Sequence, residues 1–212
     1  MKIVRHAALC VAAAFAVYFL NSSFSFLAVT VLGLPLFLDT LFTCALAFTA
    51  GPLPGIAITV ISYFITGTVR YFRFGDRGTY LYALCAVAEV LLIYGFRGYF
   101  CRGHPRRENA GGLEGSLIGT VSALLLLYLV TCMTMSLIGG MVDWTIAVTL
   151  GPVDNAASSY TFFKMGLLRN RLPLLAAAIL SRIPVNIIDR FITIFGGYGL
   201  GLLLRKVKKI NH

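Results

Sequence analysis

The chain has 212 residues, of which 58% are hydrophobic and only 12% are charged. Soluble domains carry about 25% charged residues, so this composition predicts an integral membrane protein with little mass outside the bilayer. The net charge of +10 would suit a nucleic-acid-binding protein, but the basic residues lie at the ends of apolar runs, as in membrane proteins. We therefore expect no nucleic-acid partner.

Candidate catalytic and metal-binding patterns are not found in the sequence. The five cysteines form no CxxC pair, and four of them lie inside apolar runs, so we expect small buried thiols. The three histidines lie near predicted membrane surfaces and lack metal-ligand spacing. There is no Walker loop and no readable Ser/His/Asp constellation. We expect neither an enzyme nor a bound metal or cofactor.

The first predicted membrane helix spans residues 3–20. Lys2 and Arg5 precede its apolar run, as in a signal peptide, but no convincing cleavage site follows Leu20. Ala8, Ala12 and Ala16 recur every four residues, and such a stripe of small side chains lets another helix approach closely. The approaching helix can belong to this chain or to a partner.

Residues 21–33 either extend the first helix or fold back as a lid. Two short helices follow, at 36–50 and 54–69, because the Gly-Pro-Leu-Pro-Gly sequence of Gly51–Gly55 breaks the apolar run. Asp39 lies near the start of the first of these helices, where a carboxylate complements the helix dipole.

The middle of the chain predicts a loop, a helix, a basic connection and another helix. Residues 70–78 form a polar and aromatic loop that contains Tyr71. The fourth helix, 79–96, contains Glu89, and a lone glutamate inside a membrane span is a functional candidate. It could equally pair with an arginine of another helix. The fifth helix is expected at 113–138.

A long loop is expected at 139–171, with Trp144 and Asn155, before the last helix at 183–204. The stretch Ser181–Arg190 places several polar groups between apolar runs. Asn186 and Arg190 are four residues apart and share a helix face, which Asp189 borders. This polar face predicts either a site that binds a solute or an ion pair that only stabilises the packing of the helices.

These elements predict one all-α domain of six transmembrane helices in a single bundle, with both termini in the cytoplasm. With six crossings, both termini and the connection after residue 96 lie on one side of the membrane. These three segments contain ten basic residues. The positive-inside rule makes that side cytoplasmic. Six further basic residues lie in the outer connections, where they could serve a ligand or contact lipid headgroups: Arg70, Arg73, Arg77, Lys164, Arg169 and Arg171.

Three segments together resemble the substrate-binding S components of energy-coupling factor (ECF) transporters. They are the alanine stripe, the run Leu34-Pro-Leu-Phe-Leu-Asp-Thr-Leu-Phe-Thr with the later Ala50-Gly-Pro-Leu-Pro-Gly-Ile, and Ile183-Pro-Val-Asn-Ile-Ile-Asp-Arg-Phe-Ile. The resemblance implies a six-helix bundle that captures a vitamin or similar micronutrient outside the cell. It would then dock on a partner transmembrane subunit with two ATPase subunits.

The resemblance also implies roles for particular residues. Ala8, Ala12 and Ala16 would form the docking face. The substrate would lie between the outer loops and the last three helices, with Tyr71 and Trp144 as stacking or lid residues and with five polar contacts: Glu89, Asn155, Asn186, Asp189 and Arg190. Only Asn186, Asp189 and Arg190 lie in a matching motif. The cobalt and nickel members carry His after the initiator Met, and Lys2 in that place argues against a metal substrate.

Two other functions fit the same sequence. A membrane sensory module would signal through a partner kinase, and a structural scaffold would bind no small molecule and tolerate Asn186→Ala. Each places a multi-pass protein in a membrane; the ECF resemblance implies the bacterial plasma membrane.

Overall fold

The computed structural model describes residues 2–34, 36–101, 112–151 and 159–210. Within these ranges all regular secondary structure is helical, in the order α1 (Lys2–Phe26), π-helical η1 (Leu27–Val31), α2 (Leu41–Ala50), α3 (Pro52–Phe74), 3₁₀-helical η2 (Thr79–Tyr82), α4 (Ala83–Cys101), α5 (Gly112–Thr149), α6 (Ser159–Arg169) and α7 (Leu174–Ile210). The all-helical prediction is confirmed. In the part of the chain that the structure describes, four stretches are long and apolar enough to cross a membrane: Pro52–Arg73, Thr79–Phe96, Leu117–Thr149 and Leu174–Lys206.

Several helix ends differ from the sequence prediction. Residues 21–33 extend the first helix through Phe26 and into η1, so this segment is not a folded-back lid. The expected loop at 139–171 is wrong, because α5 continues to Thr149 and α6 begins at Ser159. The last helix begins at Leu174 rather than at residue 183, and it runs through Pro184.

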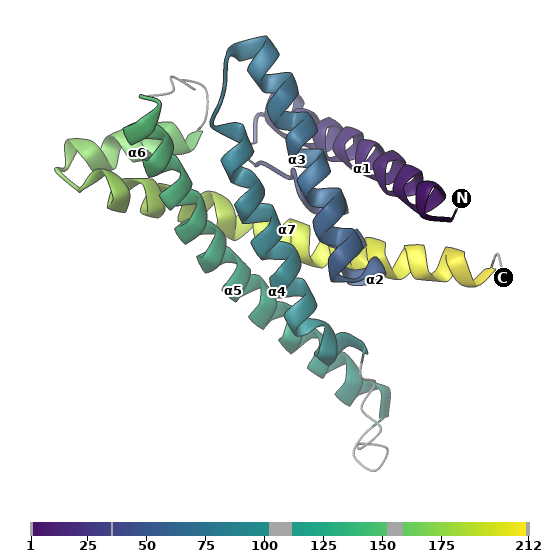
Figure 1. The fold of residues 1–212 in the computed structure, drawn as a ribbon. Helices are drawn as coiled ribbons and strands as arrows, with labels where there is room; N and C mark the ends of the chain where they lie inside the picture. The colour runs from purple at the N-terminus through teal and green to yellow at the C-terminus, as the bar shows by residue number, and fades with distance from the viewer. Residues whose placement is uncertain (1, 35, 102–111, 152–158, 211–212) are drawn as a thin grey trace.

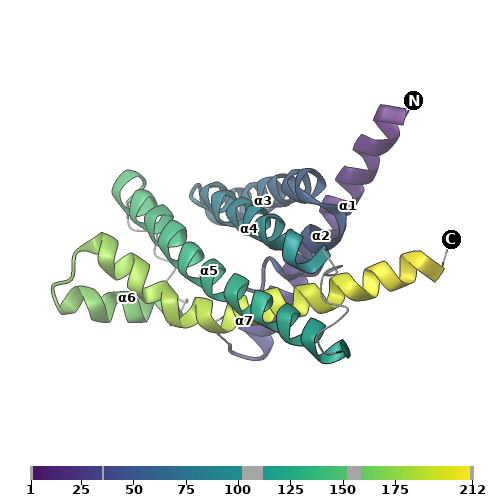
Figure 2. The ribbon, with the colours of Figure 1, turned by 90° about the horizontal axis from the view of Figure 1, so that it is seen from below.

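The helices do not form a set of parallel rods. Figure 1 shows α3 and α4 side by side in the middle of the molecule, with α7 crossing α5 obliquely. Figure 2 shows the same crossing from below, with α6 beside the N-terminal half of α7. The contacts agree, because α7 packs against α5, α2 and α6, whereas α1 packs mainly against α3. Helix α7 therefore has the most extensive packing of the described helices, mainly against α5 and α2.

Glycines allow α7 to lie close to the short helix α2. A Cβ added at Gly197 would come within 2.7 Å of the Cβ of Cys44, so no side chain fits there without movement. The neighbouring core contains Cys44 and Phe48 of α2, Val90 and Ile93 of α4, and Ile194 of α7. This packing fixes α2 between α4 and α7.

The turn between α2 and α3 follows from its glycine and proline. Gly51 has φ of +94°, a backbone conformation that glycine adopts without a Cβ clash. Pro52 is the first residue of α3, where a missing N–H costs no helical hydrogen bond. The predicted break at 51–55 is thus a tight corner, after which α3 starts at once.

One face of α1 is buried and the other is exposed. Ala14 and Val17 are buried against Ile58 of α3, and the Ser62 hydroxyl donates to the Ala14 carbonyl. Asn21 ties the other end of α1 to α2, because its amide contacts both Thr43 and the Phe42 N–H. Ala12 and Ala16 lie on the exposed face.

Candidate functional site: the polar face of α7

A row of polar side chains runs along the buried face of α7. Arg182, Asn186 and Arg190 are each four residues apart, and they are 8%, 3% and 5% exposed. Residues four apart lie on one side of a helix, so the row follows directly from the sequence. Each of the three side chains bonds to groups from other elements, and each is described in turn below.

Arg190 is the centre of a buried charged cluster. Its Nη1 donates to Glu89 Oε1 of α4 at 2.6 Å and to Thr40 Oγ1 at 2.9 Å. Its Nη2 donates to the carboxylate of the adjacent Asp189. Glu89 and Asp189 are 1% and 0% exposed, so these ion pairs lie in the interior of the helical bundle.

The segment before α2 also contacts this cluster, through Leu38 and Asp39. Asp189 Oδ1 accepts a hydrogen bond of 2.8 Å from the Leu38 N–H, where Leu38 has φ of +43°. Asp39 Oδ1 is 3.8 Å from Arg190 Nη2, and its other oxygen accepts a 2.8 Å hydrogen bond from the Tyr63 hydroxyl. The Asp39 side chain is 42% exposed, so the cluster reaches the surface at this residue.

Arg182 forms a second buried ion pair, two helical turns before Arg190. It donates to both carboxylate oxygens of Asp143 on α5, from Nε at 2.7 Å and from Nη2 at 2.9 Å. The Tyr82 hydroxyl also bonds to Asp143, and the Tyr82 ring lies 5.1 Å from the guanidinium carbon. A Cβ at Gly139 would come within 2.6 Å of Arg182 Nη1, so a glycine is needed there to seat the guanidinium.

Asn186 lies between the two ion pairs. Its amide donates to Ser136 Oγ of α5 at 2.9 Å, and the Ser136 hydroxyl donates to the Cys132 carbonyl. The polar face is therefore continuous, and it joins α7 to α5, to α4 and to the segment before α2. Most of its polar groups are paired with one another.

The structure brings together only some of the predicted substrate contacts. Glu89, Asp189 and Arg190 meet in one cluster, and Asn186 is one turn away. Asn155 lies outside the described residues. Arg182 and Asp143, which were not predicted as contacts, belong to the same face, and the four-residue spacing of Arg182 and Asn186 is the sequence signal for Arg182.

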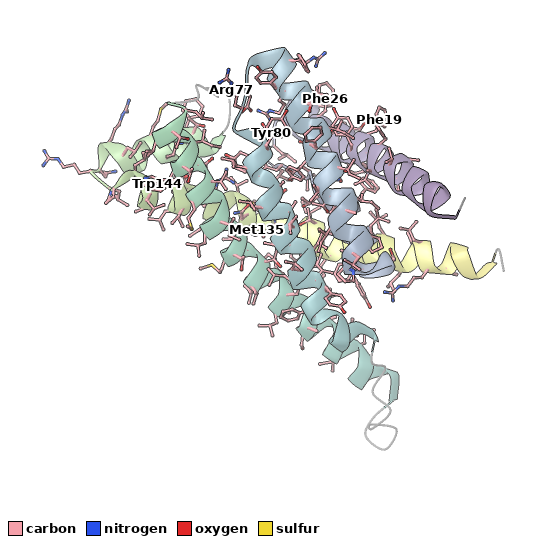
Figure 3. The ribbon with its side chains drawn as sticks, viewed as in Figure 1. Phe19, Phe26, Arg77, Tyr80, Met135 and Trp144 are labelled. Atoms are coloured by element: carbon pink, nitrogen blue, oxygen red, sulfur yellow. The ribbon has the colours of Figure 1, made fainter. Side chains whose placement is uncertain are left out.

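Tyr71 and Trp144 lie apart from the cluster. Tyr71 is 40% exposed near the end of α3, where it contacts Phe72 and lies under the Arg77 guanidinium. Trp144 is 39% exposed and lies on α5, not in a loop. Figure 3 labels Trp144 and shows it on α5, separated from Arg77 and Tyr80 at the α3–α4 end of the molecule. In this structure neither aromatic residue covers the Arg190 cluster.

The outer face of α1 carries a groove of about 520 Å³, and this groove does not share residues with the polar face of α7. Its lining is mainly apolar: Tyr18, Phe19, Ser22, Ser23, Phe24, Phe26, Leu27 and Val31. Phe19 and Phe26, labelled in Figure 3, are 68% and 63% exposed. Such a surface suits contact with lipid or with another membrane helix.

No family model, curated protein or solved structure matches this chain. The fold and the site therefore define its class by geometry. It is an all-helical protein of membrane-type composition, with an ion-paired polar face buried along α7. Among the described residues, no group of three or more His, Cys, Asp or Glu side chains is placed to hold a metal ion.

Proposed function

We propose that this chain is the substrate-binding membrane subunit of an ECF-type importer. It captures a vitamin or similar micronutrient outside the cell, and a partner transmembrane subunit and two ATPase subunits complete the uptake. The observation that carries the proposal is the buried row of Arg182, Asn186 and Arg190 in an otherwise apolar helix. Ionisable groups at such positions are costly in a membrane and commonly mark solute paths. The type of transporter rests on the three segments that resemble S components.

The alanine stripe of α1 supports a partner interface. Ala12 and Ala16 point away from α3, whereas Ala14 and Val17 take the internal packing. Ala8 belongs to the same helix, although its side chain is outside those described. Two exposed alanines one turn apart leave a shallow surface on which a partner helix can pack closely. This is the surface that we assign to the transmembrane partner.

The proposed topology has six membrane helices, α1 to α5 and α7, in the bacterial plasma membrane with both termini in the cytoplasm. Helix α2 has 10 residues, so at 1.5 Å per residue it is about 15 Å long, and in this topology it completes one crossing together with the segment before it. Figures 1 and 2 place the N and C termini at the same side of the molecule, which supports this topology.

A structural scaffold is a second candidate, and the pairing within the polar face favours it. Arg182 and Arg190 already bind carboxylates of this chain. A solute that used Arg190 would have to exchange with Glu89 or Asp189, at the cost of those hydrogen bonds. A scaffold would keep them unchanged and bind no solute. Ligand binding therefore separates the two candidates.

The test is a titration of the purified protein with a panel of water-soluble vitamins and their precursors. Fluorescence of Trp144, the only tryptophan, reports binding because this residue adjoins Asp143 in the second ion pair. A thermal-shift assay checks each hit. We expect one saturable ligand, and weaker binding of it by Asn186→Ala, which removes the amide but no charge. Asn170→Ala, the same substitution at an exposed asparagine, is the matched control. If folded protein shows no response to any compound in either assay, the scaffold is favoured.

The docking face has its own test. Ala12→Trp should abolish uptake and co-purification with the partner subunits but leave ligand affinity unchanged, because Ala12 is exposed and its replacement disturbs no internal contact. An equal loss of ligand binding would place Ala12 in the core and not at an interface.

A further inference from the structure

The buried part of the Arg190 cluster contains more carboxylates than cations. Glu89 and Asp189 are 1% and 0% exposed, and both bind the single guanidinium of Arg190. If both carboxylates are ionised, the three buried groups carry one surplus negative charge. Asp39 adds to that surplus, with its Oδ1 at 3.8 Å from Arg190 Nη2, although its side chain is 42% exposed.

Among the described residues, the surroundings of the cluster supply no second cation to offset this charge. The other titratable or charged groups that face the cluster come from the segment before α2, from α2, from α3, from α4, from α5 and from α7: Asp39, Cys44, Tyr63, Cys85, Cys132 and Arg182. The thiols and the phenol are neutral or negative at any pH. Arg182 is the one further cation of this set, and Asp143 neutralises it. An uncompensated charge in such an interior is strongly unfavourable, and a buried acid then takes up a proton.

Hydrogen bonding distinguishes the two buried acids. Both oxygens of Asp189 accept hydrogen bonds, from the Leu38 N–H and from Arg190, as suits an ionised carboxylate. Glu89 accepts from Arg190 only at Oε1. Its Oε2 is buried without a hydrogen bond of good geometry, although the Thr40 hydroxyl and the Cys44 thiol lie near the Glu89 carboxyl. A bare carboxylate oxygen is costly in this position, whereas a protonated one carries no charge.

We infer that the cluster is a proton-binding site, and that Glu89 Oε2 holds the proton. With Glu89 neutral, Asp189 and Arg190 balance each other and the buried cluster has no net charge. Glu89 still accepts the hydrogen bond from Arg190 through its carbonyl oxygen Oε1. The inference does not depend on the proposed import function, since the charge balance is the same in a receptor, a sensor or a scaffold.

Infrared spectroscopy of the intact, purified protein at neutral pH tests this inference directly. A protonated carboxyl has a carbonyl stretch above the amide I band that an ionised carboxylate lacks. We expect one such band, which shifts when the protein is labelled with ¹³C-glutamate and when it is exchanged into D₂O. Glu89→Gln should remove the band, and its amide can keep the contact with Arg190. The matched control Glu108→Gln/Glu114→Gln changes the other two glutamates and should leave the band.

A second variant tests the charge balance, and it provides an independent result if Glu89→Gln does not fold. Asp189→Asn removes the surplus negative charge but keeps an oxygen for the Leu38 N–H. Glu89 should then ionise and the band should disappear, although Glu89 is still present. The absence of a glutamate band from the wild-type protein, or a band that survives either substitution, would overturn the inference. The isotope shift of the band in Glu108→Gln/Glu114→Gln, in which Glu89 is the one remaining glutamate, decides the matter even if neither cluster variant folds.

Discussion

Arg182 and Asp143 illustrate, at the scale of single residues, how strongly buried charges depend on each other. The two side chains are 9% and 6% exposed and share two hydrogen bonds. Asp143→Asn leaves Arg182 charged without a buried counter-ion, so we expect a loss of about 3–5 kcal/mol of unfolding free energy. Denaturant unfolding in detergent measures it.

An apolar replacement of both partners gives the complementary result. Arg182→Met/Asp143→Leu removes the two charges together, so the double variant should recover most of the stability that Asp143→Asn loses. Arg73→Gln serves as the control, because Arg73 is exposed. Equal stability of Asp143→Asn and the wild-type protein would contradict a buried, uncompensated Arg182.

Asp76, in the turn between α3 and α4, predicts a pH dependence. Burial alone would raise the pKa of this carboxyl, but hydrogen bonds from Thr79, the charge of Arg70 and the backbone N–H groups of Gly78 and Thr79 lower it. Its pKa in the folded protein is therefore below the ordinary value of about 3.9. A lowered pKa stabilises the fold above the unfolded-state value, and this stabilisation is lost as pH falls through the folded-state value.

The melting temperature of Asp76→Ala against the wild-type protein measures this contribution. The variant should melt lower at neutral pH, and the difference should shrink as pH falls below about 4, where the wild-type carboxyl takes up its proton. The effect is modest, since Arg70 is 44% exposed and solvent screens the pair. An unchanged difference at acid pH would mean that Asp76 acts through packing and not through charge.

The polar face could be predicted from the sequence, but its partners could not. Helical periodicity put Asn186, Asp189 and Arg190 on adjoining positions of one helix, as the structure has them. Asp39 was interpreted only as a helix-dipole residue, whereas it also contacts Tyr63 and Arg190. The position of Asp39 depends on the hydrogen bond from the neighbouring Leu38 N–H to the Asp189 carboxylate. These two residues are 151 positions apart, and no local rule predicts such a contact.

At the scale of elements, two adjacent glycines explain why the end of α5 was misplaced. Gly139 and Gly140 follow an apolar run and look like a helix stop, yet α5 continues to Thr149. In the structure they admit α7, because a Cβ at Gly140 would come within 2.6 Å of the Ile179 Cα. Tertiary packing therefore overrides the ordinary tendency of glycine to end a helix.

Substitution by alanine tests this close approach within a single helix. Gly140→Ala forces α5 and α7 apart and should cost about 1–3 kcal/mol of unfolding free energy. Gly119→Ala is a matched control, because nothing lies within 4 Å of its added Cβ, and a gain of about 0.5–1 kcal/mol is expected there. Equal effects of the two substitutions would show that helix propensity, not the α5–α7 contact, sets the outcome.

At the scale of the whole molecule, composition predicted the helical class, but local patterns did not predict the arrangement of the helices. Apolar runs and their glycine and proline breaks located the corner between α2 and α3 and the existence of α2, α3 and α4. Their ends were less accurate, because α2 begins at Leu41 and not at residue 36, and α3 continues to Phe74, into the expected loop 70–78. The apolar runs carried no information on the crossing of α7 over α5, which depends on side-chain pairs far apart in the sequence, such as Arg182 with Asp143 and Asn186 with Ser136. Polar pairing thus selects one crossing among the many that apolar packing would allow.

The placement of the termini leads to a prediction for the whole chain in its membrane. Both termini lie at the same side of the molecule, and both carry basic residues, among them Lys2, Arg5, Arg205 and Lys206. With the positive-inside rule, this placement leads us to predict that both ends lie in the cytoplasm, as in the proposed topology. A green fluorescent protein fused to either end should fluoresce, and alkaline phosphatase fused to either end should be inactive. Arg77→Cys, in the turn between α3 and α4, should react with a membrane-impermeant maleimide in intact cells. Opposite reporter signals at the two ends would require an odd number of crossings and would exclude the six-helix topology.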